Sequence, residues 1–345
     1  MKSKILFFLL LTNSILRSQT GGENSFAFLN LPFNARSAAL GNDFITSKDQ
    51  DLNLAIQNPS LLNPLNNRQV GFNQAILASG INYGMLTYGK AMKDLNTFGS
   101  FRYVNYGNMN RYDEAGTNIG KFYAGDFILG AGLAKQINPL ISIGSNVNLI
   151  YSQYETNASF GISVDLAGTY EIKEKNLTMT ALVKNAGYQF KGFQKDSRAT
   201  LPTEFQFAIG HKFKHAPFRF SLLVHHLNKF DLTYIDPSLK PTIDVLTGDT
   251  IAAKLPGFGE KFFRHFTYQL ELILSKNLHV RTAFDYHRRQ ELKLAQKPGI
   301  AGFSFGIGMY FKRFSLDYGL IAYSSAGFNN LFTFSTNLGK WRSAK

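Results

Sequence analysis

Apolar and polar residues alternate with a period of two over most of the chain after about residue 68. In residues 218–225, for example, every second side chain from Phe218 to Val224 is apolar, and Arg219 and His225 fall on the other face. Strict alternation over short segments predicts β-strands with one apolar and one polar face. The pattern recurs in residues 268–275, 278–287, 303–311 and 332–338.

Segments of this kind predict an all-β chain of about 14 strands. An even number of antiparallel strands is expected of a bacterial outer-membrane barrel. The expected strands cover residues 68–77, 80–91, 96–106, 122–136, 140–153, 158–172, 176–185, 202–214, 217–227, 264–275, 277–287, 301–312, 314–323 and 331–341.

The polar face of these strands fits either of two folds. It could face solvent in a soluble sandwich, or the lumen of a membrane barrel. An Arg or Lys in the middle of a bilayer costs about 2–4 kcal/mol. A barrel therefore requires Arg219, Glu271 and Arg281 to face inward, and all three lie on the polar face.

The lengths of the connections favour the barrel. Outer-membrane barrels have short turns at the periplasmic end and longer loops at the external end. Every even-numbered connection is short, whereas four of the seven odd-numbered ones are long. The long connections span residues 107–121, 186–201, 228–263 and 288–300. We therefore expect a transmembrane antiparallel barrel over residues 68–341, with these loops outside the cell.

The residues before the barrel predict two further segments. Residues 1–18 have two early lysines and then a short apolar run, which is typical of a signal peptide. Residues 19–67 lack strand alternation and contain turn-forming Asn-Pro pairs. Asn34 is suited to cap a short helix through Leu40. This segment is expected to be an N-terminal hatch inside or beneath the barrel, with a periplasmic tail as the alternative.

Composition narrows the class of protein further. The chain has no Cys, which removes disulfides and thiolate chemistry, and it has 32 Phe and 16 Tyr but one Trp. Abundant aromatic residues suit the lipid face and the girdles of a barrel. The formal charge is +14, or +11 without residues 1–18. Because no nucleic-acid motif accompanies it, we expect anionic outer-membrane lipid, such as lipopolysaccharide, as the acidic neighbour.

No catalytic, cofactor or metal site is expected. The seven His residues are scattered, and His225 and His226 are adjacent on an expected strand, where their side chains would point to opposite faces. No spacing of Ser, His and Asp indicates a hydrolase, and no glycine motif indicates a phosphate loop.

Two of the long loops are candidate binding surfaces. The loop of residues 228–263 is too long for a simple turn and is the candidate surface for a protein partner. Its acidic residues are Asp231, Asp236, Asp244 and Asp249. The loop of residues 288–298 is a candidate for anionic lipid or a partner, although a solvated charged loop is the simpler interpretation. Its basic residues are Arg288, Arg289, Lys293 and Lys297.

Several stretches resemble the PorV/PorQ family. Residues 28–41, with FLNLP and RSAALG, and residues 53–63, NLAIQNPSLLN, are similar to the start of that family. Residues 214–221, 225–234, 288–293 and 298–304 are similar to its PorQ branch. Trp341, followed by residues 342–345, departs slightly from a usual barrel ending.

The resemblance implies a FadL-like barrel of the Bacteroidota outer membrane that serves the type IX secretion system. It implies a non-enzymatic part in organising the cell-surface attachment complex, beside PorZ-, PorU- and PorV-like partners. That machinery joins cargo to lipopolysaccharide. The alternative is a FadL-like channel for small hydrophobic compounds, against which the inward charges argue modestly.

Overall fold

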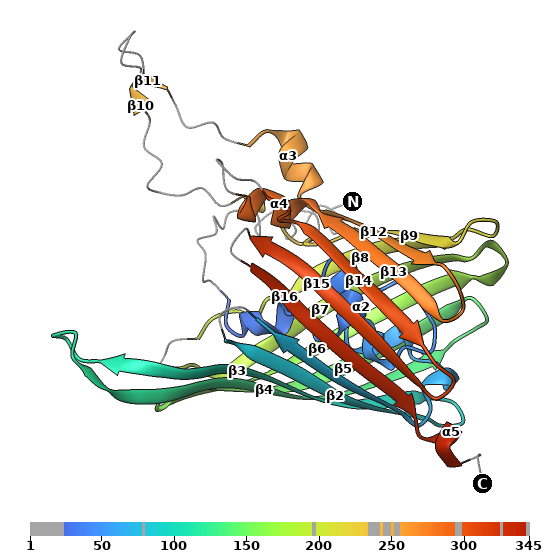
Figure 1. Cartoon of the computed structure of the whole chain (residues 1–345), viewed down its shortest axis with the longest axis horizontal. Helices are drawn as coiled ribbons and strands as arrows, with labels where there is room; N and C mark the ends of the chain where they lie inside the picture. Colours follow the sequence, from blue (N-terminus) through green and yellow to red (C-terminus); the bar gives the residue numbers. More distant parts are fainter. Residues whose placement is uncertain are drawn as a thin grey trace, which may run out of the picture. The chain divides into compact units, whose positions relative to one another are not determined.

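The computed structural model describes residues 24–77, 80–194, 198–233, 242–243, 250–251, 256–293, 299–324 and 327–342. Within these residues, 14 antiparallel strands form one closed barrel, in which the first strand pairs with both the second and the last. Each strand pairs with the next one along the chain, and closure leaves no unpaired edge. Figure 1 shows the strands crossing the barrel obliquely.

The barrel strands match the expected segments closely. They are β1 Gln69–Ile76, β2 Asn82–Ala91, β3 Asn96–Tyr112, β4 Asn118–Gln136, β5 Ile141–Tyr154, β6 Asn157–Ile172, β7 Leu177–Lys191, β8 Glu204–Lys212, β9 Phe218–Val224, β12 Phe266–Ile273, β13 Leu278–Asp285, β14 Phe303–Tyr310, β15 Phe314–Ser324 and β16 Gly327–Asn337. The predicted fold class is therefore confirmed.

Several predicted boundaries were wrong. Most of the expected loop 107–121 is strand, because β3 and β4 continue as a long hairpin to a turn at residues 113–117. Strand β7 likewise runs on to Lys191, inside the expected loop 186–201. The last strand ends at Asn337 rather than 341, and helix α5, Gly339–Arg342, follows it.

Apolar side chains cover the outside of the barrel. Phe220, Phe305, Phe334 and Leu129 are exposed, whereas the residues between them along each strand point inward. Glu271 and Arg281 are buried and Arg219 is largely buried, so all three face the lumen as predicted. An apolar outer wall around a polar interior is the arrangement that a barrel needs in a membrane. No helix among the described residues is long and apolar enough to span a membrane.

The two ends of the barrel differ as the sequence predicted. The tip of the β3–β4 hairpin and helix α4, Tyr286–Leu292, lie at the same end, and α5 lies at the other (Figure 1). Helix α3, Phe258–Phe263, precedes β12 at the end with the long connections. We call this the outer end, since long loops face outward in such barrels.

The segment before β1 fills the lumen. We call residues 24–68 the hatch. It contains α2, Ala35–Ala39, which Asn34 caps by accepting a hydrogen bond from the Ser37 N–H at 2.8 Å, as predicted. Four short 3₁₀ turns accompany α2 in the hatch. They are Ala27–Asn30, Leu52–Ile56, Pro59–Leu61 and Pro64–Asn66.

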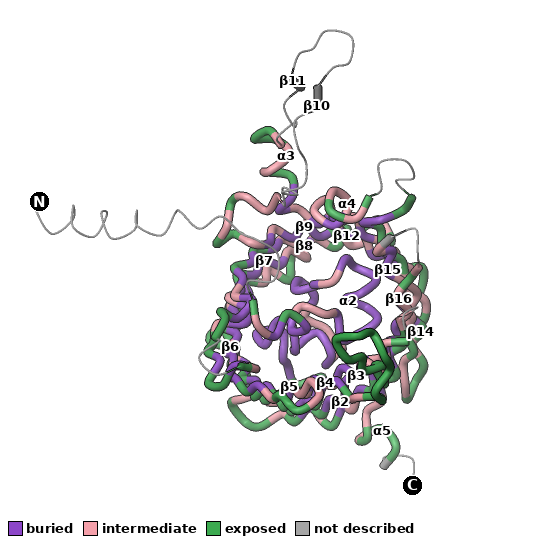
Figure 2. Tube along the Cα trace, turned by 90° about the vertical axis from the view of Figure 1, so that its left-hand side faces the viewer, coloured by how far each residue is buried: buried purple, intermediate pink, exposed green. Residues whose placement is uncertain are grey.

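The hatch is buried by the barrel wall. Ala35, Leu40 and Leu52 have no exposed surface, and Figure 2 shows α2 in the middle of the ring of strands. Over the described residues this segment lies inside the barrel, which is the position expected of a hatch rather than of a periplasmic tail. The expected signal peptide, residues 1–18, lies outside the described residues.

A second compact unit includes residues Thr233–Leu255. The parts of it that the structure describes include a two-stranded antiparallel sheet of β10, Thr242–Ile243, and β11, Thr250–Ile251. Both strands belong to the long connection of residues 228–263.

Candidate functional site

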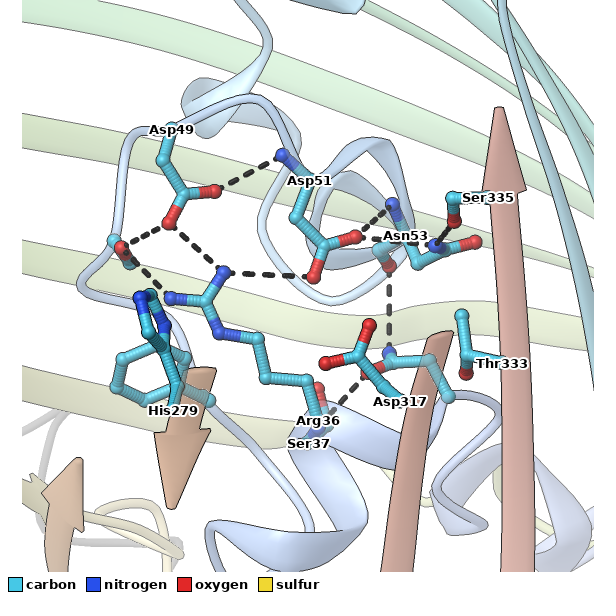
Figure 3. A network of polar contacts seen from close by, with 12 residues as sticks. Arg36, Ser37, Asp49, Asp51, Asn53, His279, Asp317, Thr333 and Ser335 are labelled. Atoms are coloured by element: carbon cyan, nitrogen blue, oxygen red, sulfur yellow. Dashed lines mark hydrogen bonds and ion pairs between the residues drawn. The ribbon is translucent and has the colours of Figure 1, made fainter. Parts of the chain in front are cut away.

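The hatch is joined to one side of the barrel by a buried network of charges. Arg36 of α2 reaches Asp49 at 2.8 Å and Asp51 at 3.5 Å within the hatch, and Glu271 of β12 at 3.1 Å. Figure 3 shows Arg36 directed at the two aspartates. The guanidinium also lies 5.2 Å from the centre of the Phe44 ring, which adds a cation–π contact.

Glu271 is the centre of this network. Strand register places Arg219 of β9 and Arg281 of β13 directly opposite it. Its carboxylate pairs with Arg219 at 2.5 Å and Arg281 at 2.8 Å, in addition to Arg36. Arg281 continues the chain of contacts to Asp317 of β15 at 2.5 Å. Such pairs are unfavourable to break, because each leaves an uncompensated buried charge.

The pKa of Asp51 in this network is unusually high for an aspartate. Burial raises its pKa to about 6, although the nearby Arg36 guanidinium opposes that shift. Asp317 and Asp49 add further repulsion against ionised Asp51. The hatch part of the network, through Asp51, therefore changes its charge at mildly acidic pH.

A second set of contacts joins the hatch to β7, β8 and β12, on and beside the same part of the wall. Lys184 of β7 pairs with Asp43 at 2.8 Å, and Gln206 of β8 donates to the same carboxylate at 2.9 Å. Gln269 of β12 donates to the carbonyl oxygens of Leu40 at 2.7 Å and Asp43 at 2.6 Å. Side chains from several strands thus fix the backbone of the hatch.

Asparagines complete the attachment near β1 and β16. Asn53 donates to Ser335 Oγ at 3.0 Å and accepts from Asn73 Nδ2 at 2.9 Å and Thr87 Oγ1 at 3.1 Å. Figure 3 shows Asn53 beside Ser335. Buried amides and hydroxyls that find partners in this way specify one position of the hatch.

Cavities remain near both ends of the lumen. The one at the outer end holds about 270 Å³, and its lining includes Asp43, Glu204, His225, Asp285 and His287. The one at the opposite end holds about 400 Å³ and lies beside Arg68, Tyr310 and Lys340. A third cavity, of about 10 Å³, lies beside Phe33 and Arg102 and has barely the room that one water needs.

Imidazoles gather at the outer cavity, contrary to the sequence analysis. Strand β9 ends at Val224, and His226 has a left-handed backbone with φ of 55°. The chain therefore turns, and the Nδ1 atoms of His225 and His226 lie 2.7 Å apart. The prediction that these side chains point to opposite faces was wrong, because the alternation of a strand does not extend past its end.

Two histidines at this cavity, His225 and His287, are uncharged near neutral pH. Burial lowers the pKa of His287 to about 3, although Asp285 opposes the shift. Burial also lowers the pKa of His225. Their imidazoles therefore have lone pairs to offer at the pH of most cell surfaces.

The predicted basic loop does not form a single patch. Residues 286–292 are helix α4 rather than a loop, and Arg288 is buried. Arg288 donates to Gly41 O in the hatch at 2.9 Å and to Ser304 Oγ at 3.2 Å, so it serves as a link between hatch and wall. Arg289 donates to Gly299 O at 2.8 Å, and Lys293 contacts Gln290. Lys297 lies outside the described residues, and lipid or partner binding by this region stays a prediction.

The predicted acidic loop is described in part. Asp231 pairs with Lys261 of α3 at 2.5 Å. Asp236, Asp244 and Asp249 lie outside the described residues. A partner-binding role for these four residues stays a prediction.

Comparison with known proteins gives results at the level of structure. No protein-family model matches the chain, and no curated protein matches its sequence. Its structure is similar to the toluene transporter TbuX of Ralstonia pickettii, with a TM-score of 0.54, 11% identity, and 90% of this chain and 100% of that chain covered. The toluene transporter TodX of Pseudomonas putida has a TM-score of 0.56 and 13% identity, with 88% and 97% covered. The CymD monoaromatic hydrocarbon channel has a TM-score of 0.52 and 13% identity, with 90% and 97% covered.

At these identities the likeness shows the fold. The matched region covers nearly the whole of each neighbouring structure. Together with the closed sheet and the apolar outer wall, the likeness gives the architecture and the location. The chain is a bacterial outer-membrane β-barrel of 14 strands with the fold of these barrels.

Proposed function

We propose that this chain is a non-enzymatic barrel that holds a surface partner for the type IX secretion system, in its cargo attachment complex. The observation that carries the proposal is the hatch, which charge pairs and amide contacts join to several sides of the wall. A barrel blocked in this way is suited to be a rigid anchor. The resemblance to the PorV/PorQ family supplies the system that the anchor serves.

The interior is poorly suited to carry hydrophobic compounds. Arg36, Arg281 and Lys184 are buried at the hatch with paired charges. A toluene-like solute passing there would have to displace these pairs and could replace none of their hydrogen bonds. A stable plug is therefore the function of the hatch in this proposal.

The partner surface belongs at the outer end. The β3–β4 hairpin, and helix α3 near the end of the long connection of residues 228–263, lie there. We propose that a PorZ-like surface protein binds the 228–263 connection, with other attachment-complex members nearby. The net positive charge would also favour the anionic headgroups of lipopolysaccharide.

A pull-down from outer membranes tests the proposal. A variant that lacks residues 233–255 should lose its surface partner and leave cargo unattached, while the barrel still inserts. A variant with the β3–β4 hairpin shortened by residues 108–121 is the matched control and should keep both. Normal cargo attachment in a deletion strain would refute the anchoring role.

The second candidate is a channel for small hydrophobic compounds. It is favoured by the neighbours, two of which are described as toluene transporters. Uptake of radiolabelled toluene by cells with and without the barrel tests it. Barrel-dependent uptake together with normal cargo attachment would favour the channel over the anchor.

A further inference from the structure

Three side chains at the outer cavity converge on one point. Glu204 begins β8, and His225 and His226 follow β9, which is paired with β8. The Nδ1 atoms of the two histidines are 2.7 Å apart, and His226 Nδ1 is 3.4 Å from Glu204 Oε1. Ligand atoms of all three residues lie within 4.8 Å of one another.

Glu204 makes no ion pair with a lysine or arginine within the described residues, and the Lys184 ammonium acts on it only at longer range. Its side chain is 5% exposed, and within the described residues the ion pair it makes goes to an imidazole. Gln206 donates to its Oε1 at 2.8 Å, which is a neutral contact. A buried charge without a compensating charge is costly, so a cation at this point would be stabilised.

The cluster also has more nitrogen atoms than hydrogen-bond partners. Nε2 of His225 and Nδ1 of His287 are buried without a hydrogen-bond partner among the described residues. The ring of His287 lies 6.3 Å from that of His225 and 6.1 Å from that of His226. A third imidazole therefore borders the pair.

The types of ligand atom indicate which class of ion would bind. We propose that Glu204, His225 and His226 bind a divalent transition-metal cation, of the class typified by Zn²⁺. Imidazole nitrogens with one carboxylate suit zinc and its neighbours, whereas Ca²⁺ and Mg²⁺ prefer oxygen ligands. Two histidines and a glutamate form a known type of zinc site that leaves a position open.

Two of the three separations between the ligand atoms are near those of a zinc site. Two nitrogens bound to one tetrahedral zinc lie about 3.3 Å apart, given bonds of 2.0–2.1 Å. The separation of His226 Nδ1 from Glu204 Oε1 already has this size, and the histidine pair must open by about 0.6 Å. The cavity of about 270 Å³ gives an ion access from the outer end.

Such an ion would join β8 and the segment after β9. It would hold residues 225 and 226, where the chain leaves the barrel toward the 228–263 connection. The metal site is independent of the type IX proposal, because it rests on these side chains alone.

Zinc titration of the purified, chelator-treated barrel in detergent tests the site. We expect one equivalent of Zn²⁺ to bind, and Co²⁺ to give the visible absorption of a nitrogen-ligated ion. His226→Ala and Glu204→Gln should each weaken zinc binding at least tenfold. His287→Ala should have a smaller effect, since His287 borders the site.

Controls make the result decisive. His215→Ala removes an exposed imidazole at the opposite end and should leave zinc binding unchanged. The heat-dependent mobility of the barrel in detergent gels reports whether each variant has folded, and Glu204→Gln keeps the size of the side chain if His226→Ala does not fold. Saturable zinc binding that survives both variants, no saturable zinc binding, or equal binding of Ca²⁺ would overturn the proposal.

Discussion

Two buried glutamates on the inner wall have opposite surroundings. Glu271 of β12 contacts three guanidinium groups, from Arg36, Arg219 and Arg281. Glu204 of β8 contacts an imidazole and an amide. Both carboxylates are almost fully buried, and their strands are separated in the sheet by β9 alone.

The difference in contacts distinguishes a carboxylate that joins the hatch to the wall from one that could bind a ligand. Arginines of the wall and of the hatch neutralise the charge of Glu271. Its contacts therefore join the wall to the hatch and leave no charge for a ligand to neutralise. Within the described residues Glu204 has no guanidinium or ammonium group in direct contact, so the same depth of burial leaves an attraction for a cation. Burial of an acid indicates a ligand site only where the protein itself does not supply the opposite charge.

The largest effect is expected from Glu271→Gln. This substitution leaves three arginines without their shared carboxylate, although Arg281 keeps Asp317 and Arg36 keeps Asp49. We expect a loss of about 3–5 kcal/mol in the free energy of unfolding. Urea unfolding of the barrel refolded in detergent, followed by circular dichroism, measures it.

The matched control for this change is Glu114→Gln. Glu114 lies in the exposed turn of the β3–β4 hairpin, so its neutralisation should leave the unfolding midpoint unchanged. Equal stability of Glu271→Gln and the wild type would show that the network does not secure the hatch.

Alternation along the chain was enough to predict the barrel. Because successive side chains in a strand point to opposite faces, the inward position of Glu271 and Arg281 could be read from the sequence. The partners of those charges across the sheet also follow once the order of strands is known. The hatch was expected as one of two alternatives, since its polar residues do not themselves tell which wall they contact.

The outer cavity could not be predicted in the same way. It depends on a left-handed residue, His226, and on the approach of β8 and α4 to residues distant in sequence. Gly41 is another such point. Its φ is +88°, and a Cβ there would lie 2.6 Å from Thr267 Cγ2, but no pattern in the sequence indicates that contact. Irregular backbone and long-range contacts leave no periodic signal.

Asp51→Asn should alter the response of the Glu271 network to pH. Because the pKa of Asp51 is raised to about 6 in the folded barrel, the folded state retains a proton that the unfolded chain loses from about pH 4. Raising the pH from about 4 to about 6 therefore costs the wild type stability at this residue. The variant lacks this loss, and its amide oxygen can still accept from the Asn53 N–H.

Unfolding midpoints measured from pH 4 to pH 7 test this. The stability of Asp51→Asn relative to the wild type should rise through that window and level off above it. Its overall effect should be smaller than that of Glu271→Gln, because Arg36 partly compensates ionised Asp51. A constant difference between the two proteins across the window would contradict the assignment.

The smallest effect is expected from Glu204→Gln in the absence of metal. The amide can still accept from Gln206 and from the His226 N–H, and no guanidinium within the described residues loses an ion pair. We expect a change of less than about 1 kcal/mol, because both donors keep an acceptor. With Zn²⁺ present at 100 times its dissociation constant, the wild type should gain about 2.7 kcal/mol and the variant much less. A large loss of stability without zinc would mean that Glu204, like Glu271, attaches parts of the barrel to one another, and that the contrast between the two glutamates is false.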